Sequence, residues 1–334
     1  MSGKTMLDKT DWKEVVAQYQ APDLRRSWWQ VVNSIIPYMG LWYLMYLSLG
    51  ISYWFTLALA VPAAGFLVRI FIIFHDCCHG SFFRSRRANA IMGYITGILT
   101  FTPYYFWKHE HAVHHATAGD LNRRGRGDVW TLTTKEYQEA SRGKRIMYRV
   151  YRNPAVMCIP GALFVFLIRN RFVGRIDGKV GERERRSVTW TTLAVVIIIL
   201  GISVVMGLKA YVLIQLPIIL MGGAAGVWLF YVQHQFEGVY WERTENWDYA
   251  SVGLKGSSYY KLPKILQWFS GNIGFHHVHH LSPKIPNYRL ERCHRDNALF
   301  RKVQPVTLRS SLASMRLRLW DEDQRQLVGF PAGR

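Results

Sequence analysis

Five long stretches of this sequence carry almost no charge, and they limit the folds that the chain can adopt. Each contains 20 to 24 residues, and Arg69 is the only charged side chain among them. An α-helix needs about 20 mainly apolar residues to cross the hydrocarbon core of a membrane. A water-soluble domain rarely holds five such stretches, so the sequence predicts an all-α integral membrane protein. The stretches are Val31–Gly50, Ile51–Phe74, Ala88–Trp107, Val188–Leu208 and Ala210–Gln233.

The distribution of positive charge predicts how these stretches are oriented. The chain has a formal net charge of +20, and its basic residues gather in Met1–Gln30, Arg84–Arg87 and Arg169–Arg186. Basic loops remain on the cytoplasmic side of a membrane. We therefore expect a cytoplasmic N-terminal segment and four transmembrane helices in two hairpins. The first hairpin joins Val31–Gly50 to Ile51–Phe74, and the second joins Val188–Leu208 to Ala210–Gln233.

Two apolar segments must begin and end on the cytoplasmic side in this topology. Pro154–Ile168 has only 15 residues, and Ala88–Trp107 contains Pro103 and two glycines. Both are predicted to be re-entrant or interfacial segments. We expect one domain over residues 1–334, with an N-terminal segment 1–30, a membrane region 31–233 and a cytoplasmic helical cap 234–334.

Histidine clusters are the main candidates for a functional site. Three clusters contain histidines spaced three or four residues apart, which places their side chains on one face of a helix. His234 follows the last predicted span. The charge-based topology puts all of these histidines at the same membrane face. The nine candidates for metal binding are His75, His79, His111, His114, His115, His234, His276, His279 and His280.

Nine imidazoles near one depth exceed what one metal ion requires, so the clusters predict two ions with four or five nitrogen ligands each. Imidazole binds iron, zinc, copper and nickel, and the residues alone leave this choice open. The four cysteines form no C-x-x-C pair, which disfavours a disulfide framework or a thiolate zinc site. A Glu-x-x-His pair, typical of soluble four-helix di-iron proteins, occurs only at Glu291–His294. His109, His277 and His294 are assigned no ligand role, and His277 is expected to point away from the shared face.

The histidine motifs and several longer segments resemble those of membrane fatty acid desaturases. The motifs are "HDCCH", "HAVHH" and "HHVHH", and the segments include "RIFIIFHDCCHGSFF", "GVWLFYVQHQFE" and "LWDEDQRQ". The chain is most similar to bacillary acyl-lipid desaturases, which act on the acyl chains of membrane phospholipids. The resemblance implies an oxidoreductase of the bacterial cell membrane that introduces a cis double bond, with delta-5 as the expected position.

The same resemblance implies a cofactor, a co-substrate and an electron donor. It implies two iron ions held at the cytoplasmic cap, dioxygen, and electrons from ferredoxin or flavodoxin. The family's eight motif histidines correspond to the motif histidines named above, and its additional histidine corresponds to His234. An asparagine that helps to complete one iron site in the related acyl-CoA desaturases corresponds to Phe230. Either another polar group replaces it, or that iron site is arranged differently.

Other residues beside the motifs are candidates for supporting roles. Carboxylates and amides can accept hydrogen bonds from metal-binding imidazoles and fix their orientation, although each could equally be an ordinary helix cap or surface residue. Tryptophans are candidates for the wall of an acyl tunnel or for anchors at the membrane surface. The polar candidates are Asp76, Glu110, Asp120, Glu237 and Asn272, and the tryptophans are Trp107, Trp130 and Trp268.

Three other functions remain open from the sequence. A fatty acyl hydroxylase or alkane-type monooxygenase would use the same histidines. A metal transporter would place its site near the middle of the membrane on broken helices, whereas these histidines are expected at the cytoplasmic ends of spans. Nucleic-acid binding is disfavoured, because the basic residues lie in loops between spans and no recognition motif is present.

Overall fold

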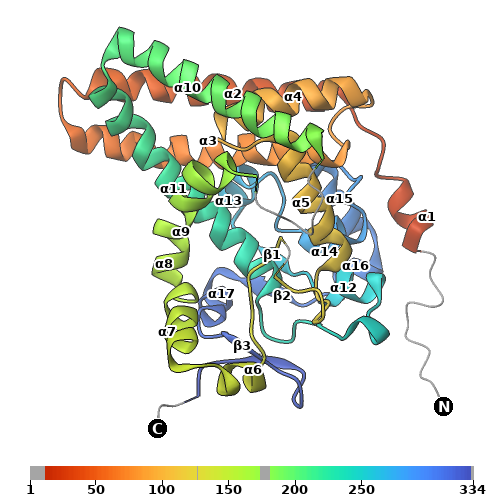
Figure 1. Ribbon diagram of the computed structural model, residues 1–334. Coiled ribbons are helices and arrows are strands. Elements are labelled where there is room, and N and C mark those ends of the chain that lie inside the picture. Colours follow the sequence, from red (N-terminus) through yellow and green to blue (C-terminus); the bar gives the residue numbers. More distant parts are fainter. Residues whose placement is uncertain (1–11, 126, 174–180, 332–334) are drawn as a thin grey trace.

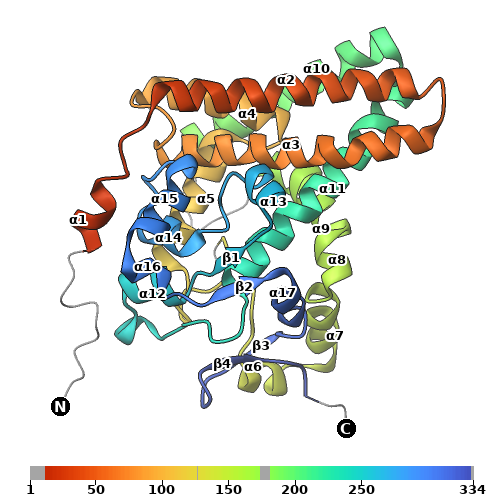
Figure 2. The same ribbon diagram turned by 180° about the vertical axis from the view of Figure 1, so that it is seen from behind.

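The computed structural model describes residues 12–125, 127–173 and 181–331. After the short helix α1 (Trp12–Ala17), two long helices, α2 (Leu24–Ser48) and α3 (Tyr53–His79), form a hairpin. They run side by side in Figures 1 and 2. The side chains of Asp23 and Ser52 accept hydrogen bonds from the first backbone amides of α2 and α3, respectively. These caps satisfy amides that have no partner within the helix, and so they fix where each helix begins.

A second hairpin consists of α10 (Glu182–Met206) and α11 (Leu208–His234). The two helices are separated only by Gly207, which has φ +85°, a backbone conformation that glycine adopts without steric cost. α11 packs against α3, while α10 packs against α4 (Arg86–Leu99) and α5 (Tyr104–Thr117). The shorter helices α4 and α5 therefore pack against both hairpins, and α5 carries the second histidine motif.

Four segments are long and apolar enough to cross a membrane, which agrees with the predicted all-α integral membrane fold. Three of them overlap most of a predicted span, but the predicted span Val31–Gly50 is not among the four. It lies largely in α2, where polar residues such as Gln30, Asn33 and Ser34 lower the mean hydropathy. The four segments are Tyr53–His79, Pro154–Arg171, Glu182–Met206 and Leu208–His234.

The segment predicted to be re-entrant or interfacial at Pro154–Ile168 is an interrupted helix that is apolar enough to span. Its regularity breaks at Ile159 (φ −100°, ψ −81°), because Pro160 cannot donate a backbone hydrogen bond. Four short elements follow one another along it. They are α8 (Pro154–Cys158), α9 (Pro160–Leu163), the π-helix η2 (Phe164–Ile168) and the 3₁₀-helix η3 (Arg169–Arg171).

The predicted segment Ala88–Trp107 divides into most of α4 and the start of α5. The chain turns between them at Phe101, which has φ +58°. The 14 residues of α4 extend about 21 Å, which is less than the roughly 30 Å of a bilayer core. The structure therefore agrees with a segment that does not cross the membrane as one helix.

The remaining elements form a cap of short helices and two small sheets. Strand β1 (Tyr259–Lys261) pairs in parallel with β2 (Pro305–Thr307), and β3 (Leu319–Asp321) pairs antiparallel with β4 (Gln326–Val328). The apolar core of the cap includes Val278, Leu281, Leu290 and Phe300. The cap helices are η4 (Thr244–Asn246), α12 (Tyr249–Lys255), α13 (Lys264–Phe269), α14 (His276–Leu281), α15 (Asn287–Asp296), α16 (Ala298–Arg301) and α17 (Leu308–Ser314), beside α6 (Thr134–Glu139) and α7 (Arg142–Tyr151).

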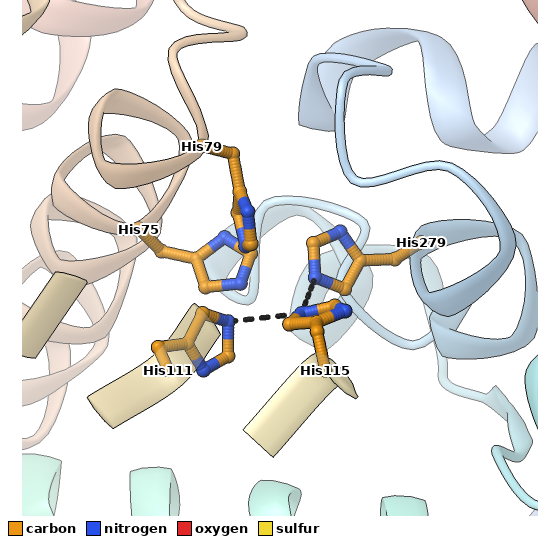
Figure 3. Close-up of side chains that lie close together, drawn as sticks. All are labelled: His75, His79, His111, His115 and His279. Carbon is orange, nitrogen blue, oxygen red and sulfur yellow. Dashed lines mark hydrogen bonds between the residues drawn. The ribbon is translucent and has the colours of Figure 1, made fainter. Parts of the chain in front are cut away.

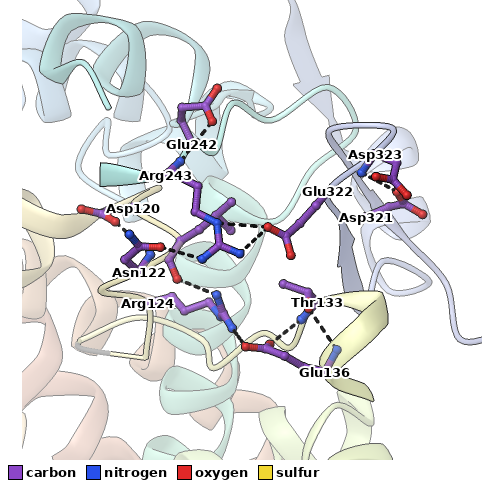
Figure 4. Close-up of polar contacts among 11 residues, drawn as sticks. Asp120, Asn122, Arg124, Thr133, Glu136, Glu242, Arg243, Asp321, Glu322 and Asp323 are labelled. Carbon is purple, nitrogen blue, oxygen red and sulfur yellow. Dashed lines mark hydrogen bonds and ion pairs between the residues drawn. The ribbon is translucent and has the colours of Figure 1, made fainter. Parts of the chain in front are cut away.

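A polar network ties the loop after α5 to the loop after α11 and to the C-terminal hairpin (Figure 4). Arg243 pairs with Glu322 and donates a hydrogen bond of 2.7 Å to the side chain of Asn122. Arg124 pairs with Glu136, which also forms a capping box with Thr133 at the start of α6. These contacts hold together the segments that follow two of the histidine-bearing helices.

Candidate metal centre

The nine predicted histidines come from four helices and meet inside the protein. His75 and His79 lie on the last turns of α3, which ends at Gly80 with φ +69°. α5 carries three more, His234 is the last residue of α11, and α14 carries the final three. Eight of the nine are buried, and His79 is partly buried. Burial of so many polar side chains requires partners or ligands.

Backbone contacts fix the position of α14, which has only six residues. Tyr260 donates a backbone hydrogen bond of 2.7 Å to Gly274, and His277 donates one of 3.2 Å to Ser258. α12 also packs against α14, and a Cβ atom on Gly253 would lie 3.2 Å from Leu281. A short helix is marginal alone, so these neighbours hold the third motif in place.

Five of the histidines form one group, in which one ring nitrogen of each lies within 4.8 Å of those of the others. Figure 3 shows their rings turned toward a common point. His115 Nε2 lies 3.1 Å from His111 Nε2 and 3.1 Å from His279 Nε2. The five members are His75, His79, His111, His115 and His279.

The other four histidines, His114, His234, His276 and His280, form a second group with the same 4.8 Å limit between their nitrogens. His234 Nε2 lies 3.1 Å from His114 Nε2 and 3.0 Å from His276 Nε2. The groups touch, because the rings of His115 and His280 stack with centroids 4.1 Å apart. The nine histidines thus divide into adjacent sets of five and four.

The nitrogen positions fit the geometry of first-row transition metals. Metal–imidazole bonds are about 2.1 Å long, so two nitrogens at right angles around one ion lie about 3 Å apart. The Nε2–Nε2 distances of 3.0 and 3.1 Å match this spacing. Buried Nε2 atoms of His79 and His280 also have no hydrogen-bond partner among the described residues. Both groups can therefore hold a metal ion.

The surroundings favour the neutral imidazoles that metal binding requires. On α5, burial lowers the pKa of His111, His114 and His115 well below the ordinary histidine value, and neighbouring imidazoles lower it further. The same causes lower the pKa of His276, His279 and His280 on α14. Each ring consequently keeps an unprotonated nitrogen at neutral pH.

Among the candidates for supporting roles, Asp76 and Trp107 contact predicted metal-binding histidines. Asp76 Oδ1 lies 3.2 Å from His75 Nδ1, and its Oδ2 accepts hydrogen bonds from the backbone and side-chain nitrogens of Asn287. The ring of Trp107 stacks on His111 with centroids 4.2 Å apart. Asn287 was not predicted, because its contact with Asp76 joins residues 211 positions apart.

The other polar and tryptophan candidates make different contacts. Arg169 binds Glu110 through two hydrogen bonds of 2.8 and 2.5 Å. Asp120 accepts hydrogen bonds from Arg123 and Thr244. The remaining candidates contact other parts of the fold or lie on the surface. Asn272 forms hydrogen bonds with Gln267 and Asn287, and Glu237 is exposed. Trp130 packs on Tyr148, and Trp268 lies beneath the guanidinium of Arg69.

Phe230 lies against the group of four histidines, with its ring centroid 5.1 Å from that of His114 and 5.3 Å from that of His234. The ring of Phe230 therefore lies beside this group, at the position that corresponds to the asparagine of the related acyl-CoA desaturases. His277 lies outside both groups, as expected, and its Nε2 is 3.0 Å from Nδ1 of His294. His109 is exposed on α5.

The apolar helices and the two buried histidine groups define an integral membrane protein with a pair of adjacent candidate metal sites. Residues 52–309 match the family model described as fatty acid desaturase. The chain belongs to the fatty acid desaturase family, which confirms the resemblance of its histidine motifs and makes the protein an oxidoreductase.

Curated relatives support this assignment at different degrees of similarity. A "Fatty acid desaturase" of Bacillus subtilis (strain 168) is 52% identical over 95% of this chain and 89% of its own length. An "sn-1 oleoyl-lipid 12-desaturase" of a Synechocystis strain is 23% identical, with 80% of this chain and 75% of the relative covered. An "sn-2 acyl-lipid omega-3 desaturase (ferredoxin), chloroplastic" of Helianthus annuus is 24% identical, with 66% and 50% covered.

Proposed function

We propose that this protein is an oxygen-dependent desaturase that introduces a cis double bond into the acyl chains of membrane phospholipids. The observation that carries the proposal is the division of the nine buried or partly buried histidines into groups of five and four, each with ring nitrogens close together. The names of relatives that act on lipid-bound acyl chains support a phospholipid substrate. The nine histidines would hold two iron ions, one in each group.

The reaction removes two hydrogen atoms from neighbouring methylene carbons. One dioxygen, two electrons and two protons are consumed with these hydrogens, and one double bond and two water molecules result. Bound iron would supply the activation of dioxygen that this chemistry needs. The protein supplies neutral nitrogen ligands, the buried position and the orientation of His75 by Asp76. No thiol or carboxylate belongs to either group of candidate ligands in the described residues.

The electrons would come from a separate carrier, a ferredoxin or a flavodoxin. The name of the Helianthus annuus relative includes ferredoxin, which supports this class of donor. The excess of Lys and Arg over Asp and Glu, 42 against 22, would attract an acidic carrier over long distances. We place the enzyme in the bacterial cell membrane with its metal centre on the cytoplasmic side, because the basic loops adjoin the histidine-bearing ends of the spans.

The position of the double bond is proposed as delta-5, from the similarity to bacillary desaturases. Such a position requires the carboxyl end of the acyl chain, and thus the headgroup, to lie near the metal centre. The regiospecificity and the reaction type are tested together by one experiment.

The test is expression of the chain in a bacterial host that lacks desaturases, followed by mass spectrometry of derivatised fatty acids that locates double bonds. A new cis double bond at one position in phospholipid acyl chains is the expected result. Hydroxylated chains would assign the protein to the hydroxylases instead. A matched strain that expresses the His279→Ala variant controls for background activity. Unchanged lipids, from membranes in which the iron-loaded protein and a reduced ferredoxin are present, would contradict the proposal.

A further inference from the structure

An open pocket lies where the start of α10 meets α4 and α5. It has a volume of about 750 Å³ and is lined by aromatic rings and by charged groups of the first turns of α10. None of its residues belongs to the histidine groups. The lining residues are Tyr94, Tyr105, Glu182, Arg183, Arg186 and Trp190.

The sequence of α10 places this pocket at the level of lipid headgroups. The first turns, Glu182–Arg186, are all charged, and the following residues to Met206 carry no charge. The boundary between the polar layer and the hydrocarbon core therefore falls near Ser187. Trp190 lies one turn further and is 61% exposed, as is typical of tryptophans at a membrane interface.

Arg183 is held in position but retains most of its capacity to bind an anion. Its guanidinium lies 3.7 Å above the ring of Tyr105 and donates a hydrogen bond of 2.5 Å to the phenol oxygen. No carboxylate pairs with it among the described residues. A guanidinium has five N–H donors and binds phosphate in a bidentate manner. The fixed side chain therefore presents unused donors to the pocket.

Arg186 provides a second positive charge in the pocket. It forms an ion pair of 3.7 Å with Glu182, but both side chains are largely exposed, at 69% and 84%. Exposed pairs of this kind contribute little free energy, so a phosphate can replace the carboxylate as its partner. The lining then carries one net positive charge, from two arginines and one glutamate.

α5 connects the pocket to the metal centre. The backbone amide of Tyr105 donates a hydrogen bond of 2.9 Å to Ser187, which fixes α5 against α10. Trp107, two residues later, stacks on His111. Tyr105 and His111 are six residues apart, which corresponds to about 9 Å along a helix axis. A headgroup beside Tyr105 would therefore lie within two turns of α5 from His111.

We propose that this pocket binds the phosphate of a phospholipid headgroup between Arg183 and Arg186, while the acyl chain extends toward the histidine groups. The choice of a phospholipid rests on the proposed function. A headgroup fixed this close to the metal centre brings the methylenes near the carboxyl end of the chain to it, in agreement with a double bond in that part of the chain.

The first experiment measures where and how tightly a phospholipid binds to the full-length protein in detergent. Dipalmitoyl phosphatidylglycerol is titrated in mixed micelles, and an analogue with a photoreactive headgroup is cross-linked and mapped to peptides. We expect cross-links within residues 94–105 and 182–190, and an affinity about tenfold lower for Arg183→Gln, because a charge-assisted contact is lost. Arg183→Lys should restore part of the affinity.

Arg185→Gln is the matched control, because Arg185 is exposed on the same turns of α10 but does not line the pocket. It should bind phosphatidylglycerol like the wild type. Equal affinities for Arg183→Gln and Arg185→Gln, or cross-links elsewhere, would overturn the proposal. Displacement of the lipid by inorganic phosphate as effectively as by phosphatidylglycerol would show a site for free phosphate instead.

Turnover measurements separate this proposal from the proposed function. Arg183→Gln should raise KM for the phospholipid about tenfold and leave kcat within about twofold, since it removes binding energy remote from the reacting carbons. Wild-type protein that binds phosphatidylglycerol through Arg183 but forms no double bond would contradict only the proposed reaction. Normal desaturation and KM in Arg183→Gln would contradict only the headgroup site.

Discussion

Asp76 joins the first histidine motif to a residue of the cap, because its Oδ2 atom accepts hydrogen bonds of 2.7 and 2.8 Å from the backbone and side-chain nitrogens of Asn287. Its other oxygen lies 3.2 Å from His75 Nδ1. The Asp76 residue is 1% exposed, so the contact is shielded from bulk solvent. One side chain thus orients an imidazole of the group of five and attaches α3 to the start of α15.

The Asp76→Asn variant should bind metal less tightly while remaining folded. The amide keeps the size of the carboxylate but loses the charge that orients His75, and comparable changes reduce metal affinity by about 10–100-fold. Metal content after dialysis against graded chelator concentrations measures the effect. Asp120→Asn is the control, because Asp120 bonds Arg123 and Thr244 and touches no histidine of either group. Equal metal retention in the two variants would refute a role for Asp76 in orienting the imidazole.

His279→Ala and His277→Ala should have different effects although the residues are only two positions apart. His279 Nε2 lies within the group of five, so its loss should reduce desaturation by at least about 100-fold and lower the bound iron. His277 bonds His294 outside both groups, so its loss should preserve iron and cost about 1–3 kcal/mol of stability through an unpaired buried partner. Iron analysis, lipid analysis and thermal melting distinguish the two. Loss of iron from His277→Ala would contradict the assignment.

Arg169→Gln should loosen the interrupted helix that ends at η3. The variant removes the guanidinium that binds the Glu110 carboxylate through two hydrogen bonds. The Glu110 side chain is only 9% exposed, so water replaces this partner poorly. Because Arg169 itself is 44% exposed, we expect a loss of about 1–2 kcal/mol, below the range for fully buried pairs. Thermal melting in detergent tests this, with Arg292→Gln on α15 as a control for an exposed ion pair. The prediction is wrong if both variants melt at the same temperature.

Metal-free protein should become less stable in acid. The pKa values of six histidines on α5 and α14 are well below the ordinary value, because burial disfavours the charged rings. The unfolded chain therefore binds more protons below about pH 6.5, and stability falls as the pH decreases through that value. Melting temperatures of chelated protein between about pH 8 and pH 5.5 should show this slope.

Replacing one buried ring with a neutral amide provides the comparison for the acid effect. His115→Gln should reduce the slope of melting temperature against pH, because one of the contributing imidazoles is removed. His109→Gln should leave the slope unchanged, since His109 is exposed on the same helix. A slope that is the same in all three proteins would show that other groups cause the acid sensitivity.

The sequence predicted the membrane fold and the meeting of the histidine motifs because both depend on short-range patterns. Uncharged stretches and spacings of three or four residues are visible locally. Two metal sites with four or five histidines each were predicted, but which histidine enters which group was not, since His114 and His115 are neighbours on α5 and yet enter different groups. Their assignment depends on the rotation of α5 relative to α11 and α14, which no local pattern encodes.

Contacts between distant segments account for the other features of the structure that the sequence did not predict. Arg152 is 1% exposed and bonds Gln235 and Leu317, far along the chain. Nothing beside it in the sequence indicates that role. The difference between the predicted spans and the four apolar segments of the structure has a similar cause. α2 contains polar residues that its packing against α3 can accommodate, whereas Pro154–Arg171 is apolar but interrupted near Pro160.

The alternation of the two groups along the backbone also restricts how such a centre can change over evolutionary time. His114 and His115, and likewise His279 and His280, supply different groups from adjacent positions. Neither half can be copied or exchanged as a separate segment of chain, because α5 and α14 each carry ligands of both groups. A single inserted or deleted codon before either pair turns both members by about 100° around the helix and removes ligands from both halves at once. The backbone of α5 and α14 therefore constrains both sites together.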